Sequence, residues 1–430
     1  MLKNILLALI LGLCAVTAFG IPGAVEFAGH WTGAIAIGGV ELPIEIDIFS
    51  QAELTAYLSI PSQGLQSGEL AVLRCDPPEL DLALEITQPP ALFYAVLGDA
   101  GLAGKFSQGG AEGSFSLERH GEPVLLEVPE FVLPEDVQEE EVWLETESGA
   151  IYGRLMTPVA GNANSVALII AGSGPTDRDG NSTLLAGKNN SLLMLACGLA
   201  QKGVASLRFD KRGVGQSADA LASEEDIVIE AYAEDAQAWL QLLRGDPRWQ
   251  KVYVIGHSEG ALIGLLASLQ EGPDAYVSLC GMGRNMADVL RGQLGLDESE
   301  GMDEAELILA ELASGRRVET VSPELMSIFR PSVQNFLISV MRYNPPELLA
   351  ALATPSLILQ GDTDLQISLE DASLLAEASP IATLRIIPGM NHVLKPAPMD
   401  RELNVKAYSD PLLPLADGLL DALLEFFQAY

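Results

Sequence analysis

The sequence predicts an α/β fold with a mostly parallel sheet flanked by helices, preceded by a small all-β domain. From about 25 to 120, short runs of apolar and polar residues alternate; after about 140, continuous apolar runs alternate with helical stretches. A stretch rich in Pro and Glu, 128–141, separates the two patterns. With 430 residues, 48% of them hydrophobic, the chain can bury two cores.

Residues 1–20 have the composition of an export signal. Lys3 precedes an apolar core, and the segment ends in Ala-Phe-Gly, a small-x-small pattern typical of a cleavage site. The apolar core is short for a membrane span, so we expect cleavage after it, a secreted or periplasmic protein, and no span in the mature chain. The alternative is a lipoprotein anchored through Cys14, although the preceding Leu13 is bulky for such a site.

The formal net charge of −35 restricts the partners of the protein. Nucleic acids and anionic membrane surfaces would repel so acidic a chain. The acidic residues are scattered rather than collected in a tail, which is typical of a solvated or salt-adapted surface. We therefore expect a small-molecule substrate and no nucleic acid partner, and nothing in the sequence indicates an oligomeric state.

The cysteines that remain after removal of the export signal, Cys75, Cys197 and Cys280, are odd in number and widely spaced. This spacing fits neither a disulfide framework nor a zinc site. Cys197 and Cys280 lie in apolar stretches, so we expect them to be small core residues. The glycine-rich loop at 172–180 lacks the Gly-Lys-Ser/Thr ending of a phosphate-binding loop, and we expect neither a metal nor another cofactor.

Residues 21–128 are expected to form the all-β domain. In the run at 42–48, Leu and Ile occupy every second position, which is the pattern of a half-buried strand. A Gln-Gly-Gly sequence at 108–110 indicates a hairpin turn. Many short strands at this spacing predict a sandwich or a small barrel, and the absence of clustered catalytic residue types favours a scaffolding role.

Residues 129–430 are expected to form the α/β domain, beginning with a β-hairpin that turns at Ser148-Gly149. The later strands are apolar throughout and alternate with helices, which indicates a parallel sheet covered on both faces. Chemistry in such sheets collects at the carboxyl ends of the strands. We expect strands at 166–172, 204–210, 251–257, 274–281 and 356–362, and helices at 192–200, 234–244 and 261–269.

The alternation of strands and helices stops between about 284 and 345. The residues there form amphipathic helical stretches that precede the strand at 356–362. An insertion of this length is uncommon as a linker, so we expect a helical cap over the functional edge of the sheet.

Ser258 lies between two glycines where the strand at 251–257 meets the following helix. This context turns the Gly-x-Ser-x-Gly pattern into a nucleophile elbow, a tight turn that presents the serine. Gly256 and Gly260 leave room where side chains would collide. The alternative is a purely structural turn.

A serine hydroxyl needs a base, and the chain has four histidines. His30 and His120 fall in the all-β domain, and His257 is adjacent to Ser258, where its side chain leaves the elbow in another direction. His392, in a loop after a late strand, is therefore the candidate base.

Two aspartates that follow the strand at 356–362 are candidates to orient the imidazole of His392. We choose Asp364, and we expect Asp362 to shape the turn by bonding local backbone. The order along the chain is then Ser258, Asp364, His392.

The region from about 140 to 430 resembles the α/β-hydrolases, in particular exported bacterial esterases and serine aminopeptidase-like hydrolases of the S33 type. The resemblance rests on GSGPTDRDGN at 172–181, RFDKRGVGQS at 208–217, GHSEG at 256–260 and GMNHVLK at 389–395, in the order of the family. The family's G-x-x-D-x-x-V/I spacing is matched by Gly361, Asp364 and Ile367.

The resemblance implies an oxyanion hole formed by the backbone N–H groups of Glu259 and Ser173. Ala171 stands where many relatives have His, which is a departure from the family pattern. Arg178 and Asp179 are expected to fix the shape of the loop at 172–181.

Asp210 and Arg212, in the second motif, are residue types that catalysis uses. The resemblance implies instead that they hold a structural turn, so we do not expect them to take part in the chemistry.

These residues predict a serine esterase that cleaves short-chain acyl esters through a Ser258–His392–Asp364 triad and an acyl-enzyme. One alternative is a serine aminopeptidase, in which cap acids such as Asp297, Glu298 and Glu300 would hold a free amine. The other is an inactive binding protein on the same fold.

Overall fold

The computed structural model describes residues 24–37, 40–50, 54–60, 65–85, 90–108, 111–124, 130–161, 163–182, 187–295, 303–322 and 325–430. The expected export signal, Cys14, and the cap acids Asp297, Glu298 and Glu300 lie outside these ranges. Contacts between Cα atoms divide the chain into two compact units, Met1–Ser62 with Gln66–Glu127, and Gln63–Leu65 with Val128–Tyr430. Within the described ranges, the helices are all too short or too polar to cross a bilayer.

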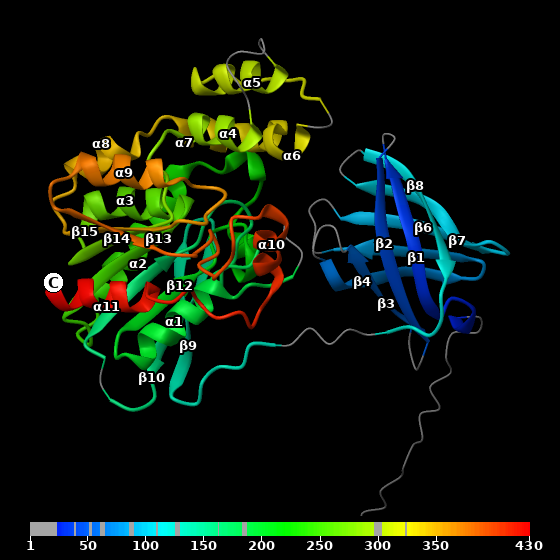
Figure 1. Ribbon diagram of the computed structural model, residues 1–430, viewed down its shortest axis with the longest axis horizontal. Helices are drawn as coiled ribbons and strands as arrows, with labels where there is room; N and C mark the ends of the chain where they lie inside the picture. Colours follow the sequence, from blue (N-terminus) through cyan, green and yellow to red (C-terminus); the bar gives the residue numbers. More distant parts are fainter. Residues whose placement is uncertain are drawn as a thin grey trace, which may run out of the picture. The chain divides into compact units, whose positions relative to one another are not determined.

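The first unit is a closed antiparallel barrel of eight strands in sequential order (Figure 1). Its strands are β1 (Gly29–Ile37), β2 (Val40–Ser50), β3 (Leu54–Ile60), β4 (Leu65–Asp76), β5 (Glu79–Leu84), β6 (Ala91–Gly98), β7 (Gly101–Gln108) and β8 (Ala111–Arg119). Pairing of β1 with β8 closes the barrel, so the barrel alternative is confirmed over the sandwich. β7 and β8 pair up to Gln108 and Ala111, and the Gly109-Gly110 part of the expected turn lies outside the described residues.

The interior of the barrel is filled by alternate side chains of its strands. Ile44, Ile46 and Ile48 of β2 are at most 1% exposed, as the period of two predicts. Phe93 packs edge-on against Phe106 and Phe115, with ring centroids 5.2 and 5.5 Å apart. The barrel therefore has a hydrophobic core of its own.

The second unit is built on an eight-stranded sheet in the order β16-β15-β14-β13-β11-β12-β10-β9. Its strands are β9 (Val137–Thr146), β10 (Gly149–Pro158), β11 (Ser165–Ile170), β12 (Ala205–Phe209), β13 (Lys251–His257), β14 (Ala275–Leu279), β15 (Ser356–Gly361) and β16 (Ala382–Ile387). β10 is antiparallel to both of its neighbours, and the pairs from β12 to β16 are parallel. Gly149 pairs with Thr146, so the first hairpin turns at Glu147-Ser148, one residue before the expected position.

Helices cover both faces of this sheet (Figure 1). One face packs against α1 (Ser191–Gln201) and α11 (Leu419–Ala429), and the other against α2 (Ile229–Gly245), α3 (Glu259–Glu271), α8 (Pro345–Ala351) and α9 (Leu369–Ala378). Along β11, Leu168 and Ile170 enter one core while Ala167 and Ile169 enter the other. A strand that is buried on both faces has to be apolar throughout, which explains its unbroken hydrophobic run.

The segment between β14 and β15 forms further helices with a small core of their own. They are α4 (Met286–Leu294), α5 (Glu304–Ala313), α6 (Met326–Phe329) and α7 (Gln334–Met341). Phe336 of α7 packs against Tyr232 of α2, and Arg330 forms an ion pair with Glu224. These contacts fasten the inserted helices to the sheet domain.

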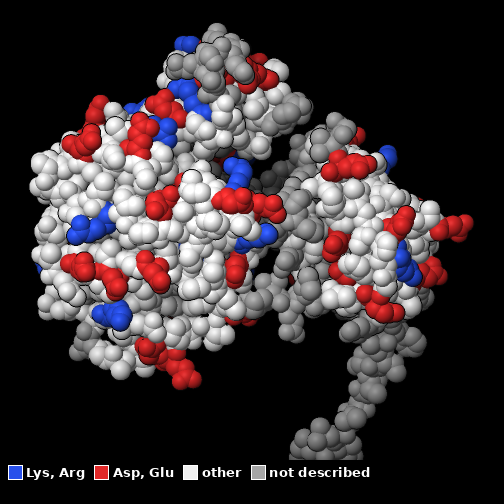
Figure 2. Space-filling model, viewed as in Figure 1, with Lys and Arg blue, Asp and Glu red and all other residues white. Residues whose placement is uncertain are grey.

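On the face shown in Figure 2, acidic side chains are spread out rather than gathered at one site. Basic side chains, fewer in number, lie among them in the same view. This distribution is the one that the scattered Asp and Glu of the sequence predicted.

Because each unit has its own core, a cavity in the barrel should destabilise the barrel alone. Phe93→Ala is expected to lower the barrel's free energy of unfolding by about 3–5 kcal/mol. Val96→Ala, a change at a side chain of the same strand that is 48% exposed, is the control and should have little effect. Calorimetry of the full chain tests this: a shift of the sheet domain's transition by Phe93→Ala would contradict the independence of the two cores.

Candidate active site

Ser258 occupies a strained turn between β13 and α3. Its φ and ψ are 56° and −122°, a conformation that a residue with a side chain rarely adopts. A Cβ on Gly256 would lie 2.2 Å from the carbonyl oxygen of Gly260, and a Cβ on Gly260 would lie 2.3 Å from that of Ile170. Both glycines are therefore required by close backbone packing, as expected for a nucleophile elbow.

The structure brings together the three residues selected from the sequence. His392 Nε2 lies 3.0 Å from Ser258 Oγ, and His392 Nδ1 lies 2.8 Å from Asp364 Oδ2. The side chains of His392 and Asp364 are 6% and 0% exposed. Ser258, His392 and Asp364 thus form a buried hydrogen-bonded chain at the carboxyl ends of the strands.

Asp364 is held by bonds to both of its carboxylate oxygens. Oδ1 accepts hydrogen bonds from the backbone N–H groups of Gln366 and Ile367. Oδ2 accepts hydrogen bonds from Gln360 Nε2 and His392 Nδ1. Burial acts to raise the pKa of Asp364, but the charge and hydrogen bond of His392, together with the backbone N–H groups of Ile367 and Gln366, hold the pKa below its ordinary value. The group therefore stays ionised next to the imidazole.

Asp362 points to a different partner. Its Oδ1 accepts the backbone N–H of Gly389 at 2.6 Å, in the loop that leads to His392. Asp362 thus binds backbone, as expected, but across to a neighbouring loop rather than within its own turn.

His257 contacts the backbone of the loop that carries His392. Its Nε2 lies 2.8 Å from the backbone oxygen of His392, which makes Nε2 the protonated nitrogen of a neutral ring. Burial, with the nearby His392, lowers the pKa of His257 to about 3. This positioning contact was not expected from the sequence, because adjacency to Ser258 does not reveal which loop the ring reaches.

The loop that follows β11 lies against the elbow. A Cβ built on Gly172 would be 3.2 Å from Ser258 Cβ, so the residue before Ser173 packs against Ser258. Within the described chain, the backbone N–H groups of Ser173 and Glu259 donate to no other protein group. Both amides are therefore available as hydrogen-bond donors beside Ser258.

Charged residues that end β12 anchor the surrounding loops. Asp210 accepts the backbone N–H and the guanidinium of Arg178 at 2.9 and 2.7 Å. Arg208 binds Asp179 at 3.0 Å, and Arg212 binds Asp235. Asp210 and Arg212 are thus structural, as the resemblance implied, and Arg178 and Asp179 hold the loop at 172–181.

Cys280 lies beside Asp364 and His392. Its sulfur, a carboxylate oxygen of Asp364 and a ring nitrogen of His392 lie within 4.8 Å of one another, a spacing that metal ligands also show. Burial raises the pKa of Cys280 well above its ordinary value, which favours the thiol over the thiolate that metals bind. Asp364 and His392 already bond each other, so these donors are poorly suited to hold a metal ion. Cys280 and Cys197 are buried and free, as expected.

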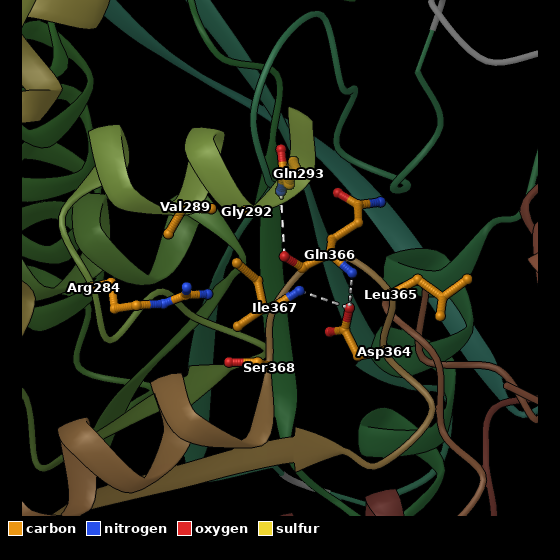
Figure 3. A pocket seen from close by; sticks show the side chains of 9 residues that line it. All are labelled: Arg284, Val289, Gly292, Gln293, Asp364, Leu365, Gln366, Ile367 and Ser368. Carbon is orange, nitrogen blue, oxygen red and sulfur yellow. Dashed lines mark hydrogen bonds between the residues drawn. The ribbon is translucent and has the colours of Figure 1, made fainter. Parts of the chain in front are cut away.

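A cavity of about 180 Å³ borders Asp364, between α4 and the loop after β15 (Figure 3). Its lining includes Arg284, Gln293, Gln366 and the loop residues around them. Arg284 binds Asp371 at 2.7 Å, so its charge is already compensated. The lining of the cavity mixes polar and apolar residues, and its charged members, Arg284 and Asp364, are both paired.

The low pKa of His257 predicts a loss of stability in acid. The unfolded ring takes up a proton as the pH falls below about 6.5, whereas the folded ring stays neutral down to about 3, so unfolding becomes easier through this window. His257→Gln keeps an N–H donor and cannot titrate. Between pH 6 and pH 4, the free energy of unfolding should fall by about 2–3 kcal/mol less in the variant than in wild type, at about 1.4 kcal/mol per pKa unit.

Urea unfolding of the sheet domain at both pH values measures this difference. His120→Gln, at an exposed position in the barrel, is the control. Parallel loss of stability in wild type and His257→Gln would contradict the assignment of a neutral buried ring.

Comparison with known proteins gives two sequence matches. Residues 189–291, which include Ser258, match the family model for serine aminopeptidase, S33. The chain is also 25% identical over 306 residues to Esterase EstD of Thermotoga maritima, covering 67% of this chain and 70% of that protein.

Solved structures with similar architecture include Est1E from Butyrivibrio proteoclasticus with bound ferulic acid. That match has 17% identity and a TM-score of 0.46, and it covers 66% of this chain and 95% of that one. Hypothetical protein PA2218 from Pseudomonas aeruginosa matches with 15% identity and a TM-score of 0.48, over 70% and 95% of the chains. The two sequence matches, together with the strand order and the tight turn at Ser258, make Val128–Tyr430 similar to the serine aminopeptidase S33 family and to an esterase.

Proposed function

We propose that this protein is a serine hydrolase that cleaves carboxylic esters. The observation that carries the proposal is the continuous hydrogen-bonded path from Ser258 Oγ through His392 to Asp364. In this path His392 can accept the serine proton while Asp364 stabilises the imidazolium that forms. The esterase named among the relatives supports the same activity.

The reaction follows from the positions of these groups. Ser258 Oγ attacks the acyl carbon as its proton passes to His392 Nε2, and the negative oxygen accepts the N–H groups of Ser173 and Glu259. The bond to the alcohol breaks as His392 returns the proton to the leaving oxygen. Water, deprotonated by His392, then attacks the acyl-enzyme and frees Ser258.

Charge pairing near the triad favours a neutral ester over the free amine of an aminopeptidase substrate. Asp364 is paired with His392, Asp371 with Arg284, and the buried Glu259 with Lys211. These three carboxylates are therefore not free to pair with a substrate ammonium. We further propose that the acyl groups are short, as expected from the sequence.

We also propose that the protein acts outside the cytoplasm. The apolar segment with its small-x-small ending at residues 1–20 supports export.

Replacing the nucleophile tests the function directly. Ser258→Ala should lower turnover of nitrophenyl esters roughly 10⁴- to 10⁶-fold without unfolding the protein, because the attacking oxygen is lost. Wild type should hydrolyse short-chain nitrophenyl esters in preference to aminoacyl nitroanilides, and a fluorophosphonate should label it only at Ser258.

Ser173→Ala is the matched control, since it keeps the backbone N–H and removes only an exposed hydroxyl. It should retain most activity. Preference for nitroanilides would favour the peptidase, and wild type that shows neither turnover nor labelling would be a binding protein on this fold.

The two aspartates after β15 should respond differently to the same change. Asp364→Asn removes the carboxylate that orients His392, so turnover should fall about 10⁴-fold while the protein stays folded. Asp362→Asn keeps an oxygen that can accept the Gly389 N–H, so it should cost at most about 1 kcal/mol and leave most activity. Kinetics and thermal melting of both variants decide the assignment; the reverse pattern would make Asp362 the catalytic acid.

A further inference from the structure

A lysine and a glutamate are buried together beneath the nucleophile elbow. Lys211 follows β12 and Glu259 is the first residue of α3; their side chains are 1% and 2% exposed. Lys211 Nζ lies 3.7 Å from Glu259 Oε1, which is an ion-pair distance but too long for a hydrogen bond. Neither residue is a member of the triad.

The ammonium of Lys211 makes its hydrogen bond to the backbone instead. Nζ donates to the carbonyl oxygen of Gly172, at the beginning of the loop that follows β11. The carbonyl of Gly172 and the N–H of Ser173 belong to one planar trans peptide, so they point in opposite directions. A bond that fixes the Gly172 oxygen on one side therefore fixes the direction of the Ser173 N–H on the other.

Stability alone gives a poor account of this pair. Both carboxylate oxygens of Glu259 are buried and accept no hydrogen bond within the described chain. Burial lowers the pKa of Lys211 and raises that of Glu259, because desolvation disfavours the charged form of each side chain. Keeping both side chains charged therefore costs free energy of folding. A buried pair with unsatisfied oxygens is often no more stable than apolar residues of the same size.

We propose that Lys211 and Glu259 are positioning residues that build the oxyanion hole. Glu259 supplies one oxyanion donor through its backbone N–H, and its side chain holds the lysine that orients the other donor, the N–H of Ser173. The ammonium also polarises the Gly172–Ser173 peptide, which strengthens that N–H as charge develops on the acyl oxygen. This inference rests on the proposed function, because an oxyanion forms only during acyl transfer.

The test is a comparison of Lys211→Met with the double variant Lys211→Met/Glu259→Gln. The single variant leaves a buried carboxylate without its cation and should be strongly destabilised. The double variant removes both charges and keeps the backbone N–H of residue 259, so its thermal stability should return toward wild type. Its kcat for a nitrophenyl ester should nevertheless stay about 10- to 100-fold below wild type, because the Gly172 carbonyl is no longer held.

A transition-state readout separates positioning from general damage. KM should change little in the double variant, while the inhibition constant of a trifluoromethyl ketone should rise by the factor by which kcat/KM falls. Lys251→Met, which removes an exposed lysine paired with Asp274 at the other end of β13, is the control and should leave both constants unchanged.

The outcomes distinguish this inference from the function on which it rests. A double variant that recovers wild-type kcat together with its stability would show that the pair is merely structural. Wild type without ester turnover or fluorophosphonate labelling would remove the proposed function, and the inference with it. Low kcat, normal KM and weakened ketone binding in a stable double variant would establish the positioning role.

Discussion

The conformation of Ser258 is the constraint on which the rest of the site depends. A positive φ with ψ of −122° costs on the order of 1–3 kcal/mol, and it persists because the surrounding backbone leaves no alternative. Gly256 and Gly260 let the turn pack against its own carbonyls and those at the end of β11. That packing aims Oγ at His392, frees the N–H of Glu259, and brings Gly172 beside the nucleophile. Any residue with a side chain at either glycine would move all three.

Four of the five residues at 208–212 are charged, and their contacts support this turn and the loops around it. Arg208 and Asp210 hold the loop at 172–181, Arg212 holds α2, and Lys211 reaches the backbone next to the elbow. A run of this composition looks like a catalytic cluster or a solvated surface when it is read as sequence. Here most of its charge is buried, and each member meets a partner that lies far away along the chain.

The sequence could predict those features that depend on local pattern. Unbroken apolar runs identified the central strands, and the glycines around Ser258 together with the small number of histidines selected the residues that the structure joins. It could not predict contacts that depend on how distant loops meet. The reach of Asp362 to Gly389, the support of His392 by His257, and the pairing of Lys211 with Glu259 all belong to this class. Closure of the barrel likewise depends on β1 meeting β8, which alternation within single strands does not encode.

The acidic run at 139–141 has a consequence for solubility. It lies on β9, the last strand in the sheet order, where a β-sheet offers unpaired backbone to other molecules. Glu139 and Glu141 are paired with Arg208 and Arg154, and the exposed Glu140 lies 3.8 Å from Arg248. Charge on an edge strand opposes its pairing with the edge of a second molecule. The barrel avoids an exposed edge strand because its strands close into a ring. The two units therefore resist aggregation by different means, one electrostatic and one topological.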